Sequence, residues 1–235
     1  MNRRQYLLLG AAAGTVGVAG CTGTGSDEQF PPYPDSESTE FSGEGDTETD
    51  SFEILNDGPT LLDVAHEGDE AFGVSILTDE EQPAAVDSIP PVTGPYSGVS
   101  IHSVEPDTYS LDIEASGEWT ATVYDLPAYE DGTGLSLPLD REGAFGAVIG
   151  PVDFGGSTVQ FDIRFDSTES VNRVLLVDRD GETSGALFDS QRMDPDTEPG
   201  VDEDGTNQTL QVDGVGYLVI ESTTGWTASV TAENS

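Results

Sequence analysis

A thirteen-residue segment occurs twice in the chain, and this repeat constrains the fold more than any other feature. Residues 111–123 read LDIEASGEWTATV and residues 218–230 read LVIESTTGWTASV, so the two segments agree at seven of thirteen positions without a gap. The matched positions include Trp119 and Trp226, the only tryptophans of the chain. A repeat of this kind in a chain of 235 residues predicts two similar folded units in tandem.

Each copy of the segment has the pattern of a β-hairpin with one buried face, because apolar and polar residues alternate on both sides of a short turn. The inward positions of the first copy are expected to be Leu111, Ile113, Ala115, Trp119, Ala121 and Val123. We expect Trp119 and Trp226 to cover the two cores with Ile113 and Ile220, and their replacement by alanine to cost about 3–5 kcal/mol. A platform for a sugar ring is the alternative role, which the matched positions in both copies disfavour.

Short segments with strand patterns, separated by turn residues, continue through the chain from about residue 51, and none beyond the N-terminus has a helical period. Upstream of the hairpin, residues 62–64 align with 161–163 and residues 77–79 with 176–178, both at an offset of 99. The second copy therefore carries about eight extra residues, for which the acidic stretch 194–205 is the candidate. These patterns predict an all-β protein with two tandem β-sandwiches, immunoglobulin-like or jelly-roll-like, at 51–130 and 140–235.

The first 21 residues have the pattern of an export signal. Arg3 and Arg4 precede a mild apolar stretch that ends in Val-Ala-Gly-Cys at Cys21, a pattern typical of a lipobox. The apolar stretch, residues 6–20, is shorter than the roughly 20 residues of a transmembrane helix. We predict that residues 1–20 are a twin-arginine lipoprotein signal and that Cys21 carries a membrane lipid on the extracellular face of the cell membrane. A free thiol or an intermolecular bridge is the alternative for Cys21, since the chain has no second cysteine.

Residues 21–50 have the composition of a disordered tether. They are rich in proline, serine, threonine, glycine and acidic residues, and they contain no basic residue. Phe30, Tyr33 and Phe41 do not fit a plain spacer, and docking of these side chains on the folded body or on a partner is the alternative.

The net charge restricts the environment and the partners of the protein. The chain has 46 acidic residues, seven arginines and no lysine, and loss of Arg3 and Arg4 with the signal leaves a net charge of −41. Such a chain repels itself in dilute buffer, but at molar salt the Debye length is only about 3 Å. The scattered arginines exclude binding to nucleic-acid phosphates, which requires clustered basic residues.

This composition resembles that of proteins from extremely halophilic archaea. The GPYSG turn at residues 94–98 and the hairpin at residues 106–119 resemble small β-sandwich modules of secreted and cell-surface proteins. Together with the signal, the chain resembles a haloarchaeal lipoprotein exported by the twin-arginine route. This resemblance implies a fold and an extracellular setting, and it implies no substrate.

Few catalytic patterns occur in the sequence. His66 and His102 lie in expected strands and are interpreted as structural. The turn at residues 94–98 places its serine one position too late for a nucleophile elbow, and no glycine-rich phosphate loop follows a strand. Carboxylates are too numerous for their spacing to identify an acid–base pair.

Calcium is the one candidate cofactor, because two acidic segments place oxygen ligands around a turn glycine. The candidate ligands are Asp178, Asp180, Glu182, Asp202, Asp204 and Asn207. Neither segment completes an EF-hand loop, and acidic loops are also the ordinary surface of a halophilic protein. Asn207 also begins an Asn-Gln-Thr sequon, which predicts glycosylation in a surface loop of an exported protein.

The expected function is that of a lipid-anchored extracellular surface protein of a halophile, acting as a non-enzymatic binding or structural module with a surface protein or glycan as partner. An accessory subunit or hydrolase acting on an extracellular polymer is the alternative. A solute receptor of a transport system is a weaker third, because such receptors are usually larger and alternate helices with strands. Sandwich folds serve many functions, so the fold does not decide among these.

Overall fold

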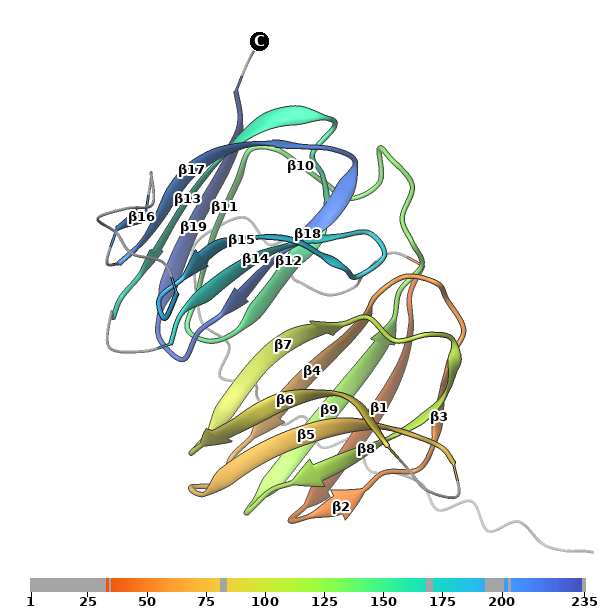
Figure 1. Ribbon diagram of the computed structural model, residues 1–235. Helices are drawn as coiled ribbons and strands as arrows, with labels where there is room; N and C mark the ends of the chain where they lie inside the picture. Colours follow the sequence, from red (N-terminus) through yellow and green to blue (C-terminus); the bar gives the residue numbers. More distant parts are fainter. Residues whose placement is uncertain are drawn as a thin grey trace, which may run out of the picture.

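The computed structural model describes residues 33, 35–80, 84–167, 171–192, 201–202 and 204–233, and its regular elements there are all β-strands (Figure 1). The strands form four sheets, which pack in pairs as two β-sandwiches. No helix in these residues is long and apolar enough to span a membrane.

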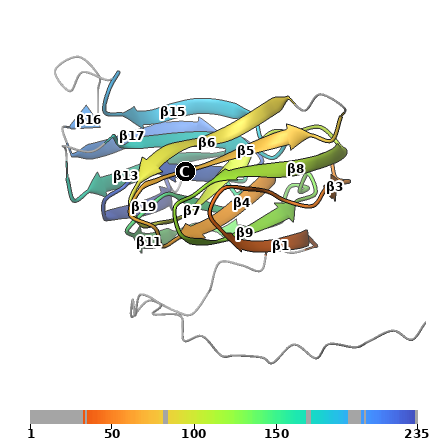
Figure 2. The ribbon, with the colours of Figure 1, turned by 90° about the horizontal axis from the view of Figure 1, so that it is seen from below.

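The first sandwich consists of two antiparallel sheets. In spatial order, one sheet contains β1 (Glu37–Glu44), β9 (Glu118–Asp125), β4 (Thr60–His66) and β7 (Tyr96–His102). The other contains β2 (Thr47–Glu48), β8 (Asp107–Glu114), β5 (Ala71–Thr78) and β6 (Ala85–Thr93), and β3 (Phe52–Ile54) also pairs with β8. The two sheets lie as stacked layers when the molecule is seen from below (Figure 2).

The second sandwich repeats this arrangement with two short additional strands. One sheet contains β11 (Leu139–Gly143), β19 (Trp226–Ala232), β13 (Ser157–Phe165), β17 (Gly205–Val212) and β16 (Val201–Asp202). The other contains β10 (Leu135–Ser136), β12 (Ala147–Asp153), β18 (Val215–Glu221), β14 (Arg173–Asp178) and β15 (Thr183–Asp189). Only the pairing of β10 with β12 is parallel.

Both sandwiches have jelly-roll topology. When β2 and β3 are counted as one interrupted strand and the additional β10 and β16 are set aside, each unit has eight strands in chain order. One sheet of each unit then has the order 1-8-3-6 and the other the order 2-7-4-5. Two interleaved Greek keys of this kind define a jelly roll, so the jelly-roll alternative is confirmed and the immunoglobulin-like one is wrong.

The sequence repeat corresponds to the last hairpin of each jelly roll, β8–β9 and β18–β19. Leu62 and Phe161 also match, because they lie opposite Val123 and Val230, respectively. The alignment of residues 77–79 with 176–178 is wrong by one residue. Ile76 lies opposite Leu111, and its counterpart opposite Leu218 is Leu176. Consecutive apolar residues in these strands leave the register undetermined by the pattern alone.

Three apolar clusters hold the molecule together. Two of them are the cores of the sandwiches, and Trp119 and Trp226 lie in these cores with 3% and 4% of their surface exposed. Ile113 and Ile220 are fully buried beside them. The predicted core roles of these four residues are therefore confirmed.

The third cluster lies between the two sandwiches. The outward face of the β1-β9-β4-β7 sheet contributes Leu61, and the outward face of the β12-β18-β14 part of the opposing sheet contributes Val177, Tyr217 and Val219. The amide of Val99 in β7 also donates a hydrogen bond of 3.2 Å to the carbonyl of Gly146, just before β12. Since the opposing sheets bury apolar residues on both faces, the two jelly rolls form one packed body (Figure 1).

The described part of the expected tether is folded. Tyr33 is 4% exposed and packs edge-on against Tyr124 at the interface between the sandwiches, with ring centroids 5.2 Å apart. Residues 37–48 form β1 and β2, and Phe41 packs against Phe52. Composition suggested a linker because β1 is an edge strand whose side chains are mostly exposed. Phe30 lies outside the described residues.

The second jelly roll has its extra residues between the strands that correspond to β6 and β7. β6 ends at Thr93 and β7 begins at Tyr96, whereas β15 ends at Asp189 and β17 begins at Gly205. This region includes the stretch predicted as the insertion, of which residues 194–200 and 203 lie outside the described residues.

Candidate functional site

The residues of the predicted export signal and anchor lie outside the described part of the chain. Arg3, Arg4 and Cys21 therefore remain predictions from the sequence. The other predicted site residues are all described.

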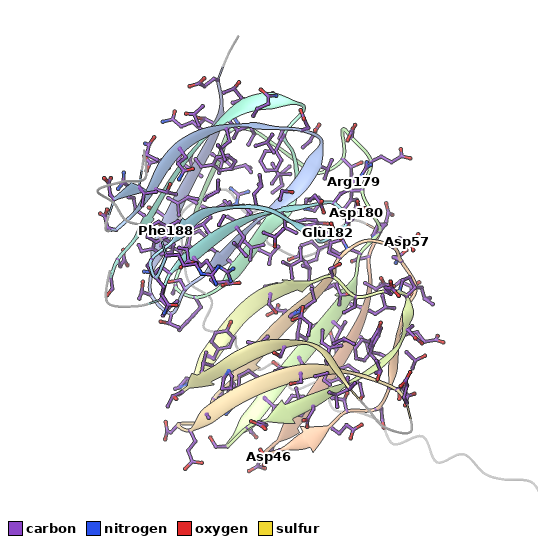
Figure 3. All side chains as sticks on the ribbon, in the orientation of Figure 1. Asp46, Asp57, Arg179, Asp180, Glu182 and Phe188 are labelled. Atoms are coloured by element: carbon purple, nitrogen blue, oxygen red, sulfur yellow. The ribbon has the colours of Figure 1, made fainter. Side chains whose placement is uncertain are left out.

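The first predicted calcium segment is the turn between β14 and β15. Asp178 Oδ1 accepts hydrogen bonds from the amides of Asp180 and Glu182, at 3.0 and 2.9 Å. Gly181 adopts a positive φ of 86°, and a side chain there would meet Pro59 of the first sandwich at 3.0 Å. Figure 3 shows Asp180 and Glu182 on the side of the second sandwich that faces the first. The carboxylate of Asp178 therefore shapes a turn that packs against the other jelly roll.

The second predicted calcium segment is organised by an arginine that sequence reasoning missed. Arg164 in β13 donates from Nη1 to Asp202 at 2.9 Å and to Asp204 at 3.0 Å, and from Nε to Asp162 at 3.1 Å. The hydrogen bonds that Arg164 donates, to Asp202 foremost and then to Asp162 and Asp204, raise the pKa of Arg164, although burial opposes them. The cation among these carboxylates is thus a guanidinium of the protein itself.

The two segments have separate partners: Asp202 and Asp204 accept from Arg164 of β13, whereas Asp178 accepts from the amides of its own turn. Within the described ranges, no group of three or more acidic, histidine or cysteine residues could hold a metal ion. Calcium binding remains a prediction. Asn207 lies in strand β17 rather than in the predicted loop, with its side chain exposed and its Oδ1 accepting from Gln160 at 3.3 Å.

His66 has a structural position at the end of β4. Its ring stacks on Phe72, with centroids 4.7 Å apart and an angle of 8° between the planes. Its Nε2 accepts a hydrogen bond from the amide of Gly68 at 3.2 Å. The ring is buried, which agrees with the structural interpretation.

His102 belongs to a serine–histidine–aspartate arrangement at the open edge of the first sandwich. Its Nδ1 lies 2.8 Å from Asp87 Oδ2, and its Nε2 lies 2.7 Å from Ser100 Oγ. Ser100 and His102 are two residues apart on β7, so both side chains point between the sheets. Asp87 comes from β6, the edge strand of the opposite sheet. The ring of His102 is 4% exposed, whereas the side chain of Asp87 is 43% exposed.

The electrostatics of this arrangement favour an ionised Asp87. Partial burial works to raise the pKa of the Asp87 carboxyl, but the hydrogen bond and charge of His102 and the amide of Ser88 outweigh it, so the pKa is lowered. The Ser88 amide donates to Asp87 Oδ1 at 2.8 Å. A carboxylate at Nδ1 holds the ring proton there and leaves Nε2 as an acceptor for the Ser100 hydroxyl.

The same edge of the second sandwich is built differently. The strand registers place Gln208, Leu210 and Gly185 at the positions of Ser100, His102 and Asp87. Gln208 Nε2 bridges the edge by donating to the carbonyl of Leu187 at 2.9 Å. All three polar groups of the first copy are therefore replaced.

A hollow of about 350 Å³ occupies this edge of the second sandwich. Its apolar lining includes Phe154, Leu176, Leu187 and Leu210, and its polar lining includes Ser184, Gln211 and Asp213. The size lies at the lower end of the range for small-molecule sites, about 300–1,000 Å³. The open edges of the two jelly rolls thus carry the two candidate sites.

Sequence reasoning missed both sites, although one signal was present. The Ser-x-His spacing at Ser100 and His102 places two polar groups on one strand face. The inward direction of this face depends on strand pairing, and so does the approach of Asp87 from another sheet. The sequence does not display strand pairing.

No protein-family model and no curated protein matches this chain. Among solved structures, the exported protein XepA of PBSX is 8% identical, with 83% of this chain and 86% of that chain covered and a TM-score of 0.29. A Cupin 2 conserved barrel domain protein from Leptotrichia buccalis is 12% identical, with 86% of each chain covered and a TM-score of 0.24. HutD from Pseudomonas fluorescens SBW25 is 10% identical over 85% of this chain and 80% of that chain, with a TM-score of 0.21. All three identities and TM-scores are low, and it is the strand order of the chain itself that defines the jelly-roll fold.

Proposed function

We propose that this protein is a lipid-anchored surface protein on the extracellular face of a halophile's membrane, and that its second jelly roll binds an uncharged glycan. The hollow between β15 and β17 is the observation that carries the binding role. In this proposal the second jelly roll binds its ligand without a chemical reaction.

The lining of the hollow supports a sugar as ligand. Sugars present apolar ring faces and hydroxyl groups, and the hollow combines a floor of Phe154 and Leu187 with polar groups at Ser184 and Asp213. Pockets that are mainly apolar with a few placed polar groups are the usual form of small-ligand sites. Ser184 is exposed, so its hydroxyl is accessible for hydrogen bonds with a ligand.

The charge of the protein supports an uncharged ligand. A mature net charge of −41 repels nucleic acids and acidic polysaccharides over the whole surface. Molar salt weakens this repulsion but supplies no attraction. A neutral glycan is not repelled by this charge and needs no electrostatic attraction to bind.

The position of Tyr33 supports a site held near the membrane. Tyr33 lies twelve positions after Cys21 and is buried at the interface between the jelly rolls. A chain of this length spans at most about 40 Å. A lipid at Cys21 would therefore keep both jelly rolls inside the cell envelope, where envelope glycans are the available polymers.

Titration calorimetry in molar KCl tests the binding role, with neutral oligosaccharides of glucose, mannose and N-acetylglucosamine as probes. We expect at least one probe to bind the wild type, and Gly185→Trp to abolish binding, because Gly185 lines the hollow and a side chain there enters open space. Ala186→Trp is the matched control, since Ala186 pairs with Leu175 of the interface cluster and so points to the opposite face of β15. Equal binding by wild type and Gly185→Trp, or no binding by any probe, would contradict the proposal.

A further inference from the structure

We propose that Ser100 of the first jelly roll is a nucleophile activated by His102, and that it hydrolyses uncharged carboxylic esters with short acyl groups. This activity is separate from glycan binding by the second jelly roll. It rests on the geometry of three side chains that converge from two sheets.

The hydrogen bonds order the three groups as nucleophile, base and orienting carboxylate. Asp87 Oδ2 lies 2.8 Å from His102 Nδ1, and the tautomer that donates this hydrogen bond presents Nε2 as an acceptor. The Ser100 hydroxyl lies 2.7 Å from Nε2, and its other contact, the carbonyl of Leu62, is much longer at 3.4 Å. The single hydroxyl proton is therefore directed at the imidazole.

The second jelly roll shows that the fold itself does not require this arrangement. Gln208 and Leu210 stand where Ser100 and His102 stand, and one hydrogen bond, from Gln208 to the carbonyl of Leu187, links the two edge strands. Placing a histidine, a serine and a carboxylate at this edge adds polar groups that must all be satisfied. The second jelly roll folds without these three groups. A purely structural role therefore does not explain why the first jelly roll has all three.

The base of the proposed site is buried, and the nucleophile is accessible. His102 is buried, which shields the base from water, whereas Ser100 is partly exposed between the edge strands β6 and β7. Val86, next to Asp87 on β6, is exposed, and we expect it to be the residue that contacts a short acyl chain. The negative charge of the protein again favours an uncharged substrate.

The reaction balances within these groups and water. Ser100 Oγ attacks the ester carbonyl carbon while its proton passes to His102 Nε2, and the carbon–oxygen bond to the alcohol then breaks as His102 returns this proton to the leaving alcohol. Water attacks the acyl-serine in the second half and gives up a proton to His102. The carboxylic acid leaves and Ser100 recovers its proton.

Two probes test the proposal on the folded chain in molar KCl: an alkyl fluorophosphonate and p-nitrophenyl acetate. We expect the fluorophosphonate to modify Ser100, identified by mass spectrometry of the digested protein. We expect Ser100→Ala to lower ester hydrolysis by at least about 100-fold, the size of a general acid–base contribution. Asp87→Asn is expected to lower the rate of fluorophosphonate labelling and the rate of ester hydrolysis. The fold should stay intact, because the side chain of Asp87 is 43% exposed.

Ser97→Ala is the matched control, since Ser97 is an exposed serine on the opposite face of the same strand. It is expected to react and hydrolyse as the wild type does. Absence of label at Ser100 in the folded wild type, or wild-type hydrolysis by Ser100→Ala, would overturn the proposal. Oligosaccharide binding by Ser100→Ala is expected to be unchanged, so failure of this proposal and failure of the glycan proposal are distinguishable.

Discussion

Gly143 lies directly against the indole of Trp226, its cross-strand neighbour, so that a methyl group on the glycine would come within 2.5 Å of the indole Cζ2. Gly43 and Trp119 repeat this relationship in the first jelly roll, where the distance would be 2.6 Å. Each indole Nε1 donates to a nearby carbonyl, of Gly45 at 3.0 Å or of Phe145 at 2.7 Å. The internal repeat therefore includes a glycine that makes room for the core tryptophan.

We predict that Gly43→Ala and Gly143→Ala each lower the free energy of unfolding by about 1–3 kcal/mol, the cost of overpacking a filled core. Denaturant titration in molar KCl measures the effect. Gly185→Ala is the control, because a methyl group there meets no atom within 4 Å, and it should leave stability unchanged. Equal stabilities for all three variants would show that the indoles move aside without cost.

Tyr217 at the interface between the jelly rolls gives a second prediction. Its ring is fully buried, and its hydroxyl has no hydrogen-bond partner among the residues described. Replacing an unsatisfied buried hydroxyl with hydrogen leaves the packing intact, so Tyr217→Phe should leave the unfolding free energy unchanged or raise it by up to about 1 kcal/mol. A loss of stability, measured by denaturant titration, would show that the hydroxyl has a partner.

The interface tyrosines also predict a loss of stability at alkaline pH. Burial, and then the charge of Asp35, raise the pKa of Tyr129 to about 12, and burial raises the pKa of Tyr217 still further. The unfolded chain loses these protons near pH 10, before the folded chain does. Between neutral pH and about pH 10 the tyrosines should leave stability constant, and stability should fall between about pH 10 and 12. The unfolding free energy of Tyr217→Phe should fall less steeply over this pH range. A wild-type unfolding free energy that does not change with pH there would contradict this account.

Arg164 predicts how the protein responds to calcium. In the wild type, millimolar calcium at constant molar KCl should leave the melting temperature unchanged, because the guanidinium already occupies the space between Asp162, Asp202 and Asp204 and pairs with all three. Arg164→Ala should lose about 1 kcal/mol or less, since the arginine is 37% exposed.

The arginine variant should then gain melting temperature on addition of calcium, because three carboxylates are left without their cation. Arg192→Ala is the control for a general effect of losing one positive charge, and it should show no calcium response. Stabilisation of the wild type by calcium would instead support the metal site expected from the sequence.

The parts of the fold that could be predicted from the sequence are those with one buried face. Trp119, Ala121 and Val123 alternate with polar residues, so their pattern identified both the strand and its core face. The edge strand β1 has few buried side chains, so nothing in its pattern distinguished it from a linker. The apolar runs of β14 and β18 are buried on both faces, which concealed the packing of one jelly roll on the other.

The candidate sites could not be predicted for a different physical reason. Asp87 and His102 lie in opposite sheets, and only the jelly-roll order brings the two edge strands together. Arg164 likewise reaches Asp202 across strand pairing that local spacing does not reveal. Sequence spacing identifies a site when all of its residues share one strand or loop, and each of these two arrangements draws at least one residue from another strand.

The predicted anchor is tested by localisation. Cys21→Ser should release the protein from the membrane into the medium, because the lipid supplies the attachment. Replacement of Arg3 and Arg4 by lysine should keep the protein in the cytoplasm with its signal uncleaved. Fractionation followed by intact-mass measurement reads out both results. Membrane retention of the Cys21→Ser protein would contradict lipid anchoring.

The central claim, that the second jelly roll binds an envelope glycan, is tested most directly in intact cells. A photo-crosslinking amino acid at position 185 would report what enters the hollow, and the same residue at position 87 would report the matched edge of the first jelly roll. The account predicts a glycan adduct from position 185 that excess neutral oligosaccharide suppresses, and none from position 87. Only protein adducts from position 185, or equal glycan adducts from both positions, would contradict it.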